Sequence, residues 1–335
     1  MPSGPTTVGG EGAYGERRRR DRLHSAAAAA LGVPSEPTEV GGGAYGERRL
    51  RGRRHDAAPA AAGPPVRLSE TPRPEWDALV GAALSRIGAG ELEKVVVARR
   101  SHLAGAALDL PAAAARMARA YPGCVRFAFE RGGAIFLGAS PERLVLVSGA
   151  RVEVDALAGS IPRVPGEDEA RIRALLSSDK DRREQALVID GIRAALAPFG
   201  AAVSAPGEPV IRALKNVFHL STPIRVELPR RAHALSLAEA LHPTPAVCGL
   251  PRPAADEWLA ENEPLSRGWY AAPVGWFDAA GDGELAVAIR SGLVRGGEAW
   301  LYAGAGIVRG SEPAREYAET AAKQAAMLAA LGVAP

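Results

Sequence analysis

The chain has 335 residues, with 41 Lys and Arg against 38 Asp and Glu, a formal net charge of +3 and a pI near 9.0. Its two cysteines exclude a disulfide-stabilised scaffold and favour a reducing compartment, so we expect a cytoplasmic protein. No run of apolar residues approaches the length of a membrane-spanning helix, and we expect no membrane partner.

The basic charge is concentrated in the first part of the chain. Residues 1–54 carry ten Arg and six acidic residues, whereas 55–335 carry 31 basic and 32 acidic residues, a net charge of −1. VGGEGAYGERRRR (8–20) recurs as VGGGAYGERRLRGRR (40–54), and the Gly-, Arg- and Ala-rich composition predicts a disordered tail over 1–65. An RNA-binding arm and a twin-arginine export signal are the alternative interpretations of this tail. For the protein as a whole we expect no nucleic acid partner.

After the tail, one catalytic domain is expected over 66–335. Helical periodicity predicts helices, and Val-rich or alternating runs predict strands, several of which pair as hairpins. In chain order the expected elements are a helix at 74–90, a strand at 92–100, a helix at 111–123, strands at 125–130 and 134–140, two strands within 143–159, a mostly helical segment at 167–200, strands at 217–228, 271–278, 284–295 and 299–308, and a helix at 312–331. Strands outnumber helices, which predicts an α+β fold of large, mostly antiparallel sheets packed with outer helices.

Lysine is scarce in this chain. Only four of the 41 basic residues are Lys, namely Lys94, Lys180, Lys215 and Lys323. Since Arg does not give up its proton, a retained Lys marks a candidate position that needs an amine able to lose one. Lys94 lies within an apolar strand, where burial favours the neutral amine of a general base. A lysine that extends from a strand end to water fits the same pattern.

Four carboxylates stand out by their helical spacing. Asp181 and Glu184 lie three residues apart, as do Glu316 and Glu319, so each pair shares one face of a helix. If the two helices face each other, the pairs offer oxygen ligands to a hard divalent cation. An ordinary solvated helix surface, with Glu319 and Lys323 as a routine ion pair, is the alternative.

Further candidate residues lie at strand ends and turns. Glu142 follows Ser-Pro at a strand edge and is either a general acid or a turn residue. His219 and His242 lack a third ligand at zinc spacing, so they fit hydrogen-bonding or buried core histidines. The small residues of 302–313 predict either a carboxylate site made of backbone N–H groups or a simple tight turn. Ser311 is the expected N-cap of the last helix.

Nine blocks of sequence, taken in order, resemble the chorismate-utilising enzymes, and among them the isochorismate synthases. They are EKVVVAR (93–99), FLGASPERL (136–144), ALAGSIPR (156–163), KDRREQALVIDGI (180–192), NVFHLSTPI (216–224), LHPTPAVCGLPR (241–252), RGWYAAPVGWFD (267–278), AVAIRSGLV (286–294) and YAGAGIVRGSEPAREYAETAAKQAAML (302–328). The resemblance implies a layered α/β sandwich and a monomer. It also implies an Mg²⁺-dependent isomerase that adds water at carbon 2 of chorismate with loss of the carbon-4 hydroxyl, in menaquinone or siderophore biosynthesis.

The resemblance also implies roles for individual residues. Lys94 matches the general base and Glu142 the general acid. The residues that match substrate-binding or pocket-lining groups are Gly159, Ser160, His219, Thr244, Ala246, Arg290, Gly304, Ala305 and Lys323.

The same resemblance assigns the metal site. Glu184 and Glu319 match the Mg²⁺ ligands. Asp181 and Glu316 match outer carboxylates that hold the waters of the ion. Together these matches place the implied magnesium site on the two helices that carry the spaced carboxylates.

Related activities remain as alternatives. Family members that admit ammonia usually carry Gln where Lys94 stands, and aminodeoxychorismate synthases tend to carry a second Lys where Ala158 stands. Salicylate synthases share the lysine but usually differ in the block that matches HPTPAVCG (242–249), which here resembles that of an isochorismate synthase. We therefore prefer water addition without pyruvate elimination over a salicylate, anthranilate or aminodeoxychorismate synthase. Family members usually have a longer region before the lysine block, where this chain has only 74–90. A shortened, inactive relative that acts as a binding protein is therefore the alternative of a different class.

Overall fold

The computed structural model describes residues 67–105, 108–204 and 207–333. Within the chain, Gly63–Pro335 forms one compact unit. The tail predicted over 1–65 lies outside the described residues, so its disorder stays a prediction.

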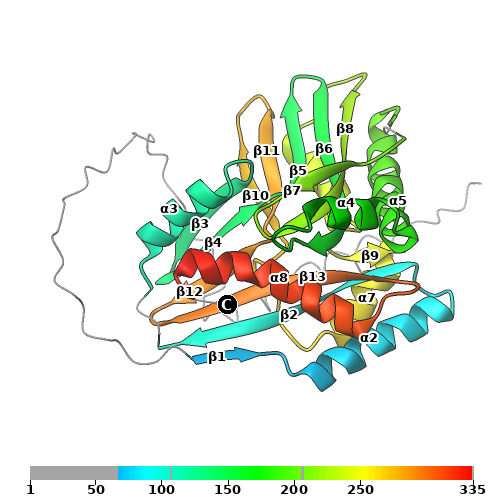
Figure 1. Cartoon of the computed structure of the whole chain (residues 1–335). Coiled ribbons are helices and arrows are strands. Elements are labelled where there is room, and N and C mark those ends of the chain that lie inside the picture. Colours follow the sequence, from blue (N-terminus) through cyan, green and yellow to red (C-terminus); the bar gives the residue numbers. More distant parts are fainter. Residues whose placement is uncertain (1–66, 106–107, 205–206, 334–335) are drawn as a thin grey trace, which may run out of the picture. The chain divides into compact units, whose positions relative to one another are not determined.

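The strands of the first sheet follow the path β1-β2-β13-β12-β4-β3, and β9 pairs with the start of β2 (Figure 1). They are β1 (Arg67–Glu70), β2 (Lys94–Ala104), β3 (Val125–Arg131), β4 (Ala134–Ser140), β9 (Gly249–Leu250), β12 (Ser291–Arg295) and β13 (Glu298–Val308). The central pair β2–β13 keeps its register from Glu298 opposite Ala104 to Val308 opposite Lys94. These two strands join sequence segments that lie far apart in the chain.

The second sheet has the strand order β10-β11-β5-β6-β8-β7. Its strands are β5 (Arg143–Ser148), β6 (Arg151–Pro162), β7 (Val210–Ala213), β8 (Val217–Glu227), β10 (Pro273–Phe277) and β11 (Gly283–Val287). The β6–β8 ladder shifts register between Ala158 and Ser160, at Gly159, whose φ is +71°. This bulge changes the direction of β6 where the strand carries residues of the predicted site.

Helices cover the outer faces of the sheets (Figure 1). They are α2 (Arg73–Gly88), α3 (Leu110–Ala120), α4 (Asp168–Leu176), α5 (Asp179–Leu196) followed by a 3₁₀ turn (Ala197–Phe199), α6 (Ala234–Leu241), α7 (Arg252–Asn262) and α8 (Pro313–Leu331). On the first sheet, Trp76 of α2 and Trp258 of α7 pack in one cluster with Val95 and Ile307 of the central strands.

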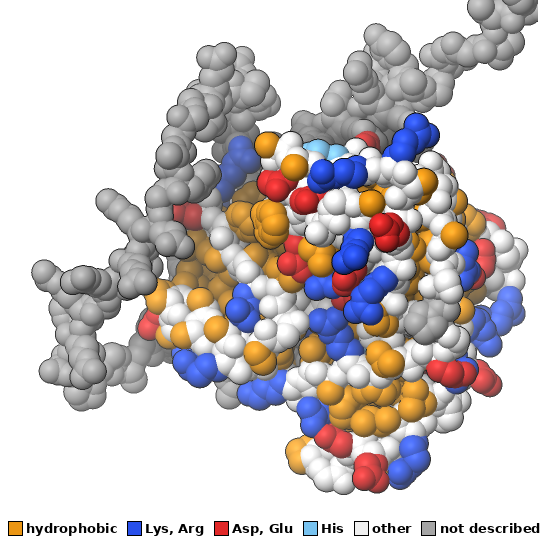
Figure 2. All heavy atoms as spheres, turned by 90° about the horizontal axis from the view of Figure 1, so that it is seen from above, with side chains coloured by type: hydrophobic (Ala, Val, Ile, Leu, Met, Phe, Trp, Pro, Cys, Tyr) orange, Lys and Arg blue, Asp and Glu red, His pale blue; other side chains and the backbone are white. Residues whose placement is uncertain are grey.

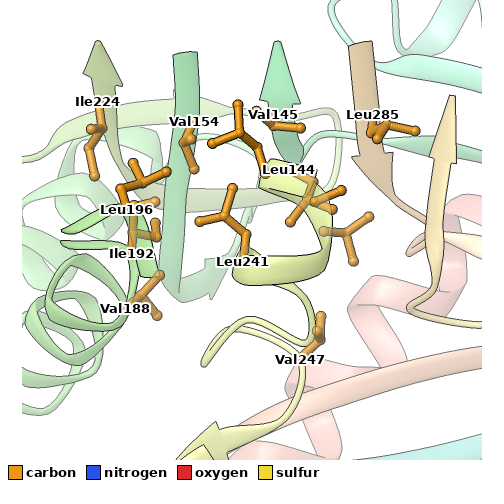
Figure 3. Close-up of a cluster of buried hydrophobic side chains, with 14 of the residues drawn as sticks. Leu144, Val145, Val154, Val188, Ile192, Leu196, Ile224, Leu241, Val247 and Leu285 are labelled. Carbon is orange, nitrogen blue, oxygen red and sulfur yellow. The ribbon is translucent and has the colours of Figure 1, made fainter. Parts of the chain in front are cut away.

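The largest buried cluster lies between the second sheet and the helices α5 and α6. Val188, Ile192 and Leu196 recur at intervals of four along α5, so one face of this helix is apolar. They pack in the same cluster as Val154 of β6 and Ile224 of β8 (Figure 3). This packing fixes the rotation of α5 about its axis, and hence the direction of the polar side chains in its first turns.

The structure confirms the predicted fold class, since every strand pair among the described residues is antiparallel. The single strand expected at 284–295 is wrong, because β11 and β12 belong to different sheets. The chain changes direction at Arg290, whose φ is +52°. The segment expected to be helical at 167–200 consists of two α-helices, and the side chain of Ser178 caps the second.

The N-cap predicted for the last helix is wrong. The N-cap of α8 is Glu312, and its side chain makes no capping hydrogen bond. Ser311 instead accepts a hydrogen bond from the backbone N–H of Val308 at 3.2 Å, which closes the turn between β13 and α8. Ser311 thus stabilises the turn that precedes α8 and does not cap the helix itself.

The described surface carries charges of both signs. On the face shown in Figure 2, basic and acidic side chains are interspersed among apolar and neutral ones. Although the chain has a pI near 9.0, its basic side chains do not form one continuous patch on this face. No helix in the described part of the chain is long and apolar enough to cross a membrane.

Candidate active site

A pocket with about 600 Å³ of empty space, its open mouth included, is lined by residues from both sheets. Nine of the predicted site residues line it, namely Glu142, Gly159, Ser160, Glu184, His219, Ala246, Arg290, Gly304 and Lys323. The other predicted residues do not line the pocket but adjoin it through the contacts described below. The structure thus brings together segments that span most of the described chain.

Lys94 and Glu184 form a buried ion pair beside this pocket. Lys94 Nζ lies 3.0 Å from Glu184 Oε1, and the Lys94 side chain is fully buried. Burial acts to raise the pKa of Glu184, but Lys94 and Lys180 outweigh it and hold that pKa below its usual value. A Cβ on Gly306 of β13 would come within 2.0 Å of Glu184 Oε1 and 3.0 Å of Lys94 Cε. Glycine at this position therefore leaves the space that the ion pair occupies.

Glu142 is a buried carboxyl group held by the backbone between β4 and β5. Its N–H donates to Ser140 Oγ at 3.2 Å, and its carbonyl accepts from the N–H of Val287 at 3.0 Å. Burial raises the pKa of Glu142 to about 7, although Lys94 acts to lower it. A large fraction of Glu142 thus keeps its proton at neutral pH, as a general acid requires.

His219 and Arg290 meet through a buried hydrogen bond. Arg290 Nη2 lies 2.7 Å from His219 Nε2. Burial, reinforced by the charge of Arg290, holds the pKa of His219 well below its usual value, so the imidazole is neutral and accepts at Nε2. The guanidinium is thereby oriented toward the pocket that both residues line.

One edge of β13 is open toward the pocket. Within the described chain, β12 pairs with β13 only as far as Leu301, so the residues after it have no strand on that side. Lys323 Nζ donates to the carbonyl of Gly304 at 2.8 Å, which shows that the backbone of Gly304 points away from β2. By the alternation of an antiparallel ladder, the N–H of Ala305 points to Val97 instead. Gly304 therefore has the free amide, and Ala305 is a buried packing residue.

Two further lysine–carboxylate pairs join α5, α8 and the bulge of β6. Lys180 Nζ lies 2.8 Å from Glu316 Oε1, and Lys323 Nζ lies 2.5 Å from Glu319 Oε1. Ser160 Oγ donates to Glu319 Oε1 at 2.8 Å. Burial and the neighbouring Glu319 raise the pKa of Glu316 to about 7, while Lys180 acts to lower it. The carboxylates of Glu316 and Glu319 therefore repel each other in the first turns of α8.

The remaining predicted residues adjoin the pocket. Asp181 Cβ would lie 2.9 Å from a Cβ on Gly159, so α5 packs directly against the bulge of β6. Burial raises the pKa of Asp181. Thr244 Oγ1 accepts from the N–H of Ala246 at 3.2 Å and so shapes the loop that carries this pocket-lining residue.

The carboxylates that the resemblance assigns to Mg²⁺ lie on α5 and α8. Among the described residues, no three His, Cys, Asp or Glu side chains lie close enough together to hold a metal ion. Glu184, Glu316 and Glu319 each contact a lysine instead. Carboxylate oxygens are the ligands that Mg²⁺ prefers, and a divalent cation would offset the repulsion from Glu319 that, after burial, raises the pKa of Glu316. The residue types therefore suit a hard cation, but in this structure the carboxylates pair with lysines and do not gather around one position.

Sequence reasoning missed several residues of the site, among them two tyrosines and a lysine. Tyr270 and Tyr302 line the pocket, with stacked rings whose centroids are 5.2 Å apart. Neither residue carries a spacing signal in the sequence. Lys180 was singled out by the scarcity of lysine but was not assigned to the site, because its partner Glu316 lies on a different helix.

The fold and the pocket define a class of protein. Two antiparallel sheets with outer helices enclose a polar pocket that has a buried acid, a buried amine and two cations, which suits a small anionic substrate. The chain belongs to the family described as chorismate binding enzyme, whose model matches residues 46–332.

Named relatives and solved structures are similar to the chain. It is 43% identical over 265 residues to the salicylate biosynthesis isochorismate synthase of Pseudomonas aeruginosa, covering 78% of this chain and 56% of that protein. The isochorismate synthase MenF of Bacillus subtilis is 42% identical over 266 residues, with the same two coverages. The crystal structure of a putative 2,3-dihydroxybenzoate-specific isochorismate synthase from Bacillus anthracis superposes with a TM-score of 0.77 at 36% identity, covering 80% of this chain and 75% of that one. The chain thus spans little more than half the length of the first two relatives.

Proposed function

We propose that this protein converts chorismate to isochorismate. The observation that carries the proposal is a single pocket lined by Glu142, whose pKa is near 7, and adjoined by the buried amine of Lys94. Relatives named isochorismate synthase that are more than 40% identical support the same activity. One relative is named for salicylate biosynthesis, and a similar solved structure, that of Escherichia coli MenF, is described as menaquinone-specific. We place the product of this chain in menaquinone or siderophore biosynthesis.

In the proposed reaction Lys94 is the general base. Once the proton of its ion pair with Glu184 has been released, the amine accepts a proton from a water molecule, and the resulting hydroxide bonds to carbon 2 of the ring. The nearby Glu184 carboxylate, 3.0 Å from Nζ, positions the amine and stabilises the ammonium that forms. Burial of Lys94 keeps bulk water from competing for its proton.

Glu142 is the general acid of the same reaction. It donates its proton to the carbon-4 hydroxyl, which leaves as water while the ring double bonds shift. A carboxyl group with a pKa near 7 supplies this proton at neutral pH, whereas an ordinary glutamate is already ionised. General acid and general base catalysis typically contribute roughly 10²–10⁴-fold each.

The substrate is a dianion, so its charge must be offset within a pocket rich in carboxylates. Arg290, held by His219, and Lys323 provide two cations for charge-assisted hydrogen bonds. Glu184 and Glu319, with Asp181 and Glu316 behind them, would hold Mg²⁺, which when bound offsets the negative charge of a substrate carboxylate.

The test is to incubate the purified chain with chorismate and Mg²⁺ and to separate the products by chromatography. We expect isochorismate as the product. Salicylate or anthranilate as the sole product contradicts the proposal, as does the absence of turnover by correctly folded protein.

A pair of lysine variants separates the base from general charge effects. Lys94→Ala is expected to reduce turnover at least about a hundredfold, since it removes the proton acceptor. Lys215 is exposed and lies outside the pocket, so Lys215→Ala is expected to keep full activity. Equal activity of the two variants contradicts the role of Lys94. Circular dichroism checks that both variants are folded.

A further inference from the structure

The longest open strand edge of the described chain belongs to β3. β3 has 7 residues and ends the path of the first sheet, where it pairs only with β4 (Figure 1). The other terminal strands are shorter, with 4 residues in β1 and β7 and 5 in β10, which also starts at Pro273. Short strands and proline protect a sheet edge against pairing, and β3 has neither protection.

The register of β4 shows which backbone groups of β3 are free. The N–H of Ala139 donates to the carbonyl of Arg290, so Ala139 faces β12 and its partner in the ladder, Arg126, faces outward. By the same alternation Ala128 and Glu130 also direct their N–H and C=O groups outward. Three alternate residues of β3 therefore present backbone N–H and C=O groups that no strand among the described residues satisfies.

A second copy of β3, related by a two-fold axis through Ala128, satisfies all of these groups. In this antiparallel register Ala128 lies opposite its own copy, and Arg126 lies opposite Glu130 in both directions. Every outward-facing residue then belongs to a hydrogen-bonded pair. A two-fold axis through another residue leaves some of these donors and acceptors unpaired.

The side chains agree with the same register. Arg126 and Glu130 are both exposed. The two-fold axis places Arg126 of each copy beside the oppositely charged Glu130 of the other copy. Glu130 has no ion-pair partner within the described residues, and the Arg126 guanidinium makes only long contacts of 3.5 and 3.4 Å to the carbonyls of Tyr121 and Pro122. On the other face, Phe129, which is 46% exposed, comes opposite the largely buried Phe127 of the second copy. The backbone groups and the two charges therefore select one alignment.

We propose that two copies of this chain associate through β3 and join their first sheets into one continuous antiparallel sheet. The interface is isologous, with a hydrogen-bonded strand pair at its centre, two Arg126–Glu130 pairs on one face and two Phe127–Phe129 pairs on the other. This departs from the monomer that the family resemblance implies. The pocket does not include β3, so the association is independent of the proposed reaction.

The test measures the oligomeric state of the full chain by sedimentation over a wide range of concentration. We expect a concentration-dependent dimer. Arg126→Glu and Glu130→Arg each place like charges opposite each other twice, so each variant alone is expected to weaken dimerisation about tenfold or more. Ala128→Pro, which removes the central N–H donor on the outward edge, is expected to abolish it.

Restoration distinguishes pairing from unfolding. The double variant Arg126→Glu/Glu130→Arg exchanges the two charges and is expected to dimerise like the wild type, and the two single variants are expected to form a mixed dimer when combined. Arg173→Glu, on an α4 side chain that is 72% exposed, is the control and is expected to have no effect. A monomer at every concentration, or a dimer that survives both single reversals and Ala128→Pro, overturns the proposal.

Discussion

The raised pKa that suits Glu142 to the proposed reaction also costs stability. The site buries a carboxyl group without a direct cationic partner, and burial shifts its pKa to about 7. The neutral acid is what the proposed reaction needs. The ionised form above that pH is a buried charge that the fold must tolerate.

The Glu142→Gln variant tests the proton donor. Glutamine keeps the shape of the side chain but has no acidic proton, so turnover is expected to fall about 10²–10⁴-fold. In the wild type, kcat/KM is expected to decline as pH rises through about 7, because Glu142 then loses its proton. Steady-state kinetics between acidic and alkaline pH measure both effects. Glu75→Gln, on the exposed side of α2, is the control and is expected to keep wild-type activity.

The Glu142→Gln variant is also expected to be more stable than the wild type at alkaline pH. The folded protein binds the Glu142 proton more tightly than the unfolded chain does, since the pKa is raised from 4.5 to about 7. This contribution to the free energy of unfolding is full below pH 4.5 and is lost as pH rises through 7. Glu142→Gln avoids the loss, with a gain of up to about 3 kcal/mol at pH 8 and none attributable to ionisation at pH 4. Urea unfolding at both pH values measures the difference, and a gain that is equal at both contradicts the argument.

Residue type and local spacing single out only part of the site, and the family resemblance implies the rest, Gly159 and Arg290 among them. Lys94 is a rare lysine in an apolar strand, and Glu316 and Glu319 share a helix face. The partner of each charge is set by the tertiary fold instead. The contacts of Lys94 with Glu184 and of Lys180 with Glu316 join separate segments, and no local pattern predicts them.

Strand β13 positions the site because it carries glycine where side chains from other elements need space. Gly306→Ala is expected to push the Glu184 carboxylate away from Lys94 and to reduce turnover about a hundredfold, because the added Cβ would lie 2.0 Å from Glu184 Oε1. Gly81→Ala is the matched control. No atom lies within 4 Å of its added Cβ, and alanine in α2 is expected to raise the free energy of unfolding by about 0.5–1 kcal/mol with activity unchanged. Kinetics and urea unfolding of both variants check the contrast, which equal turnover would refute.

Long elements with a clear period could be predicted, and short ones could not. The strands β2 and β13 and the helix α8 follow from apolar runs of the expected length. The strand β9 has two residues, and the helix α7 is held by tertiary burial of Ala255 and Trp258 rather than by its own pattern. Elements of this kind exist because neighbours cover them, which a single sequence does not reveal.

At the level of the whole chain, fold class follows from the balance of strands and helices, whereas sheet order does not. β2 pairs with β13 across some two hundred residues of sequence, although β8 in the other sheet has the same length. The division of the strand expected at 284–295 between two sheets depends on the backbone at Arg290. Such long-range choices require the complete fold.

Removal of residues 1–62 tests how far the described unit acts alone. All pocket-lining residues lie between Val96 and Lys323, and the compact unit begins at Gly63. We therefore expect kcat/KM for chorismate and the urea midpoint of unfolding to be unchanged by the deletion. Binding of RNA that disappears with the deletion and weakens steeply with salt would instead support the arm interpretation of the tail. A large loss of turnover contradicts the expected independence of the catalytic unit.

The pairing of lysines with carboxylates has a practical consequence for labelling. The chain has four lysine side chains, and three of them contact acidic residues of the site. An amine-reactive reagent therefore meets Lys215 as the exposed side-chain amine, while the other three are shielded to different degrees. Ligands that displace these contacts will change which lysines are modified, so intact-protein mass spectrometry can report occupancy of the site without a coupled assay.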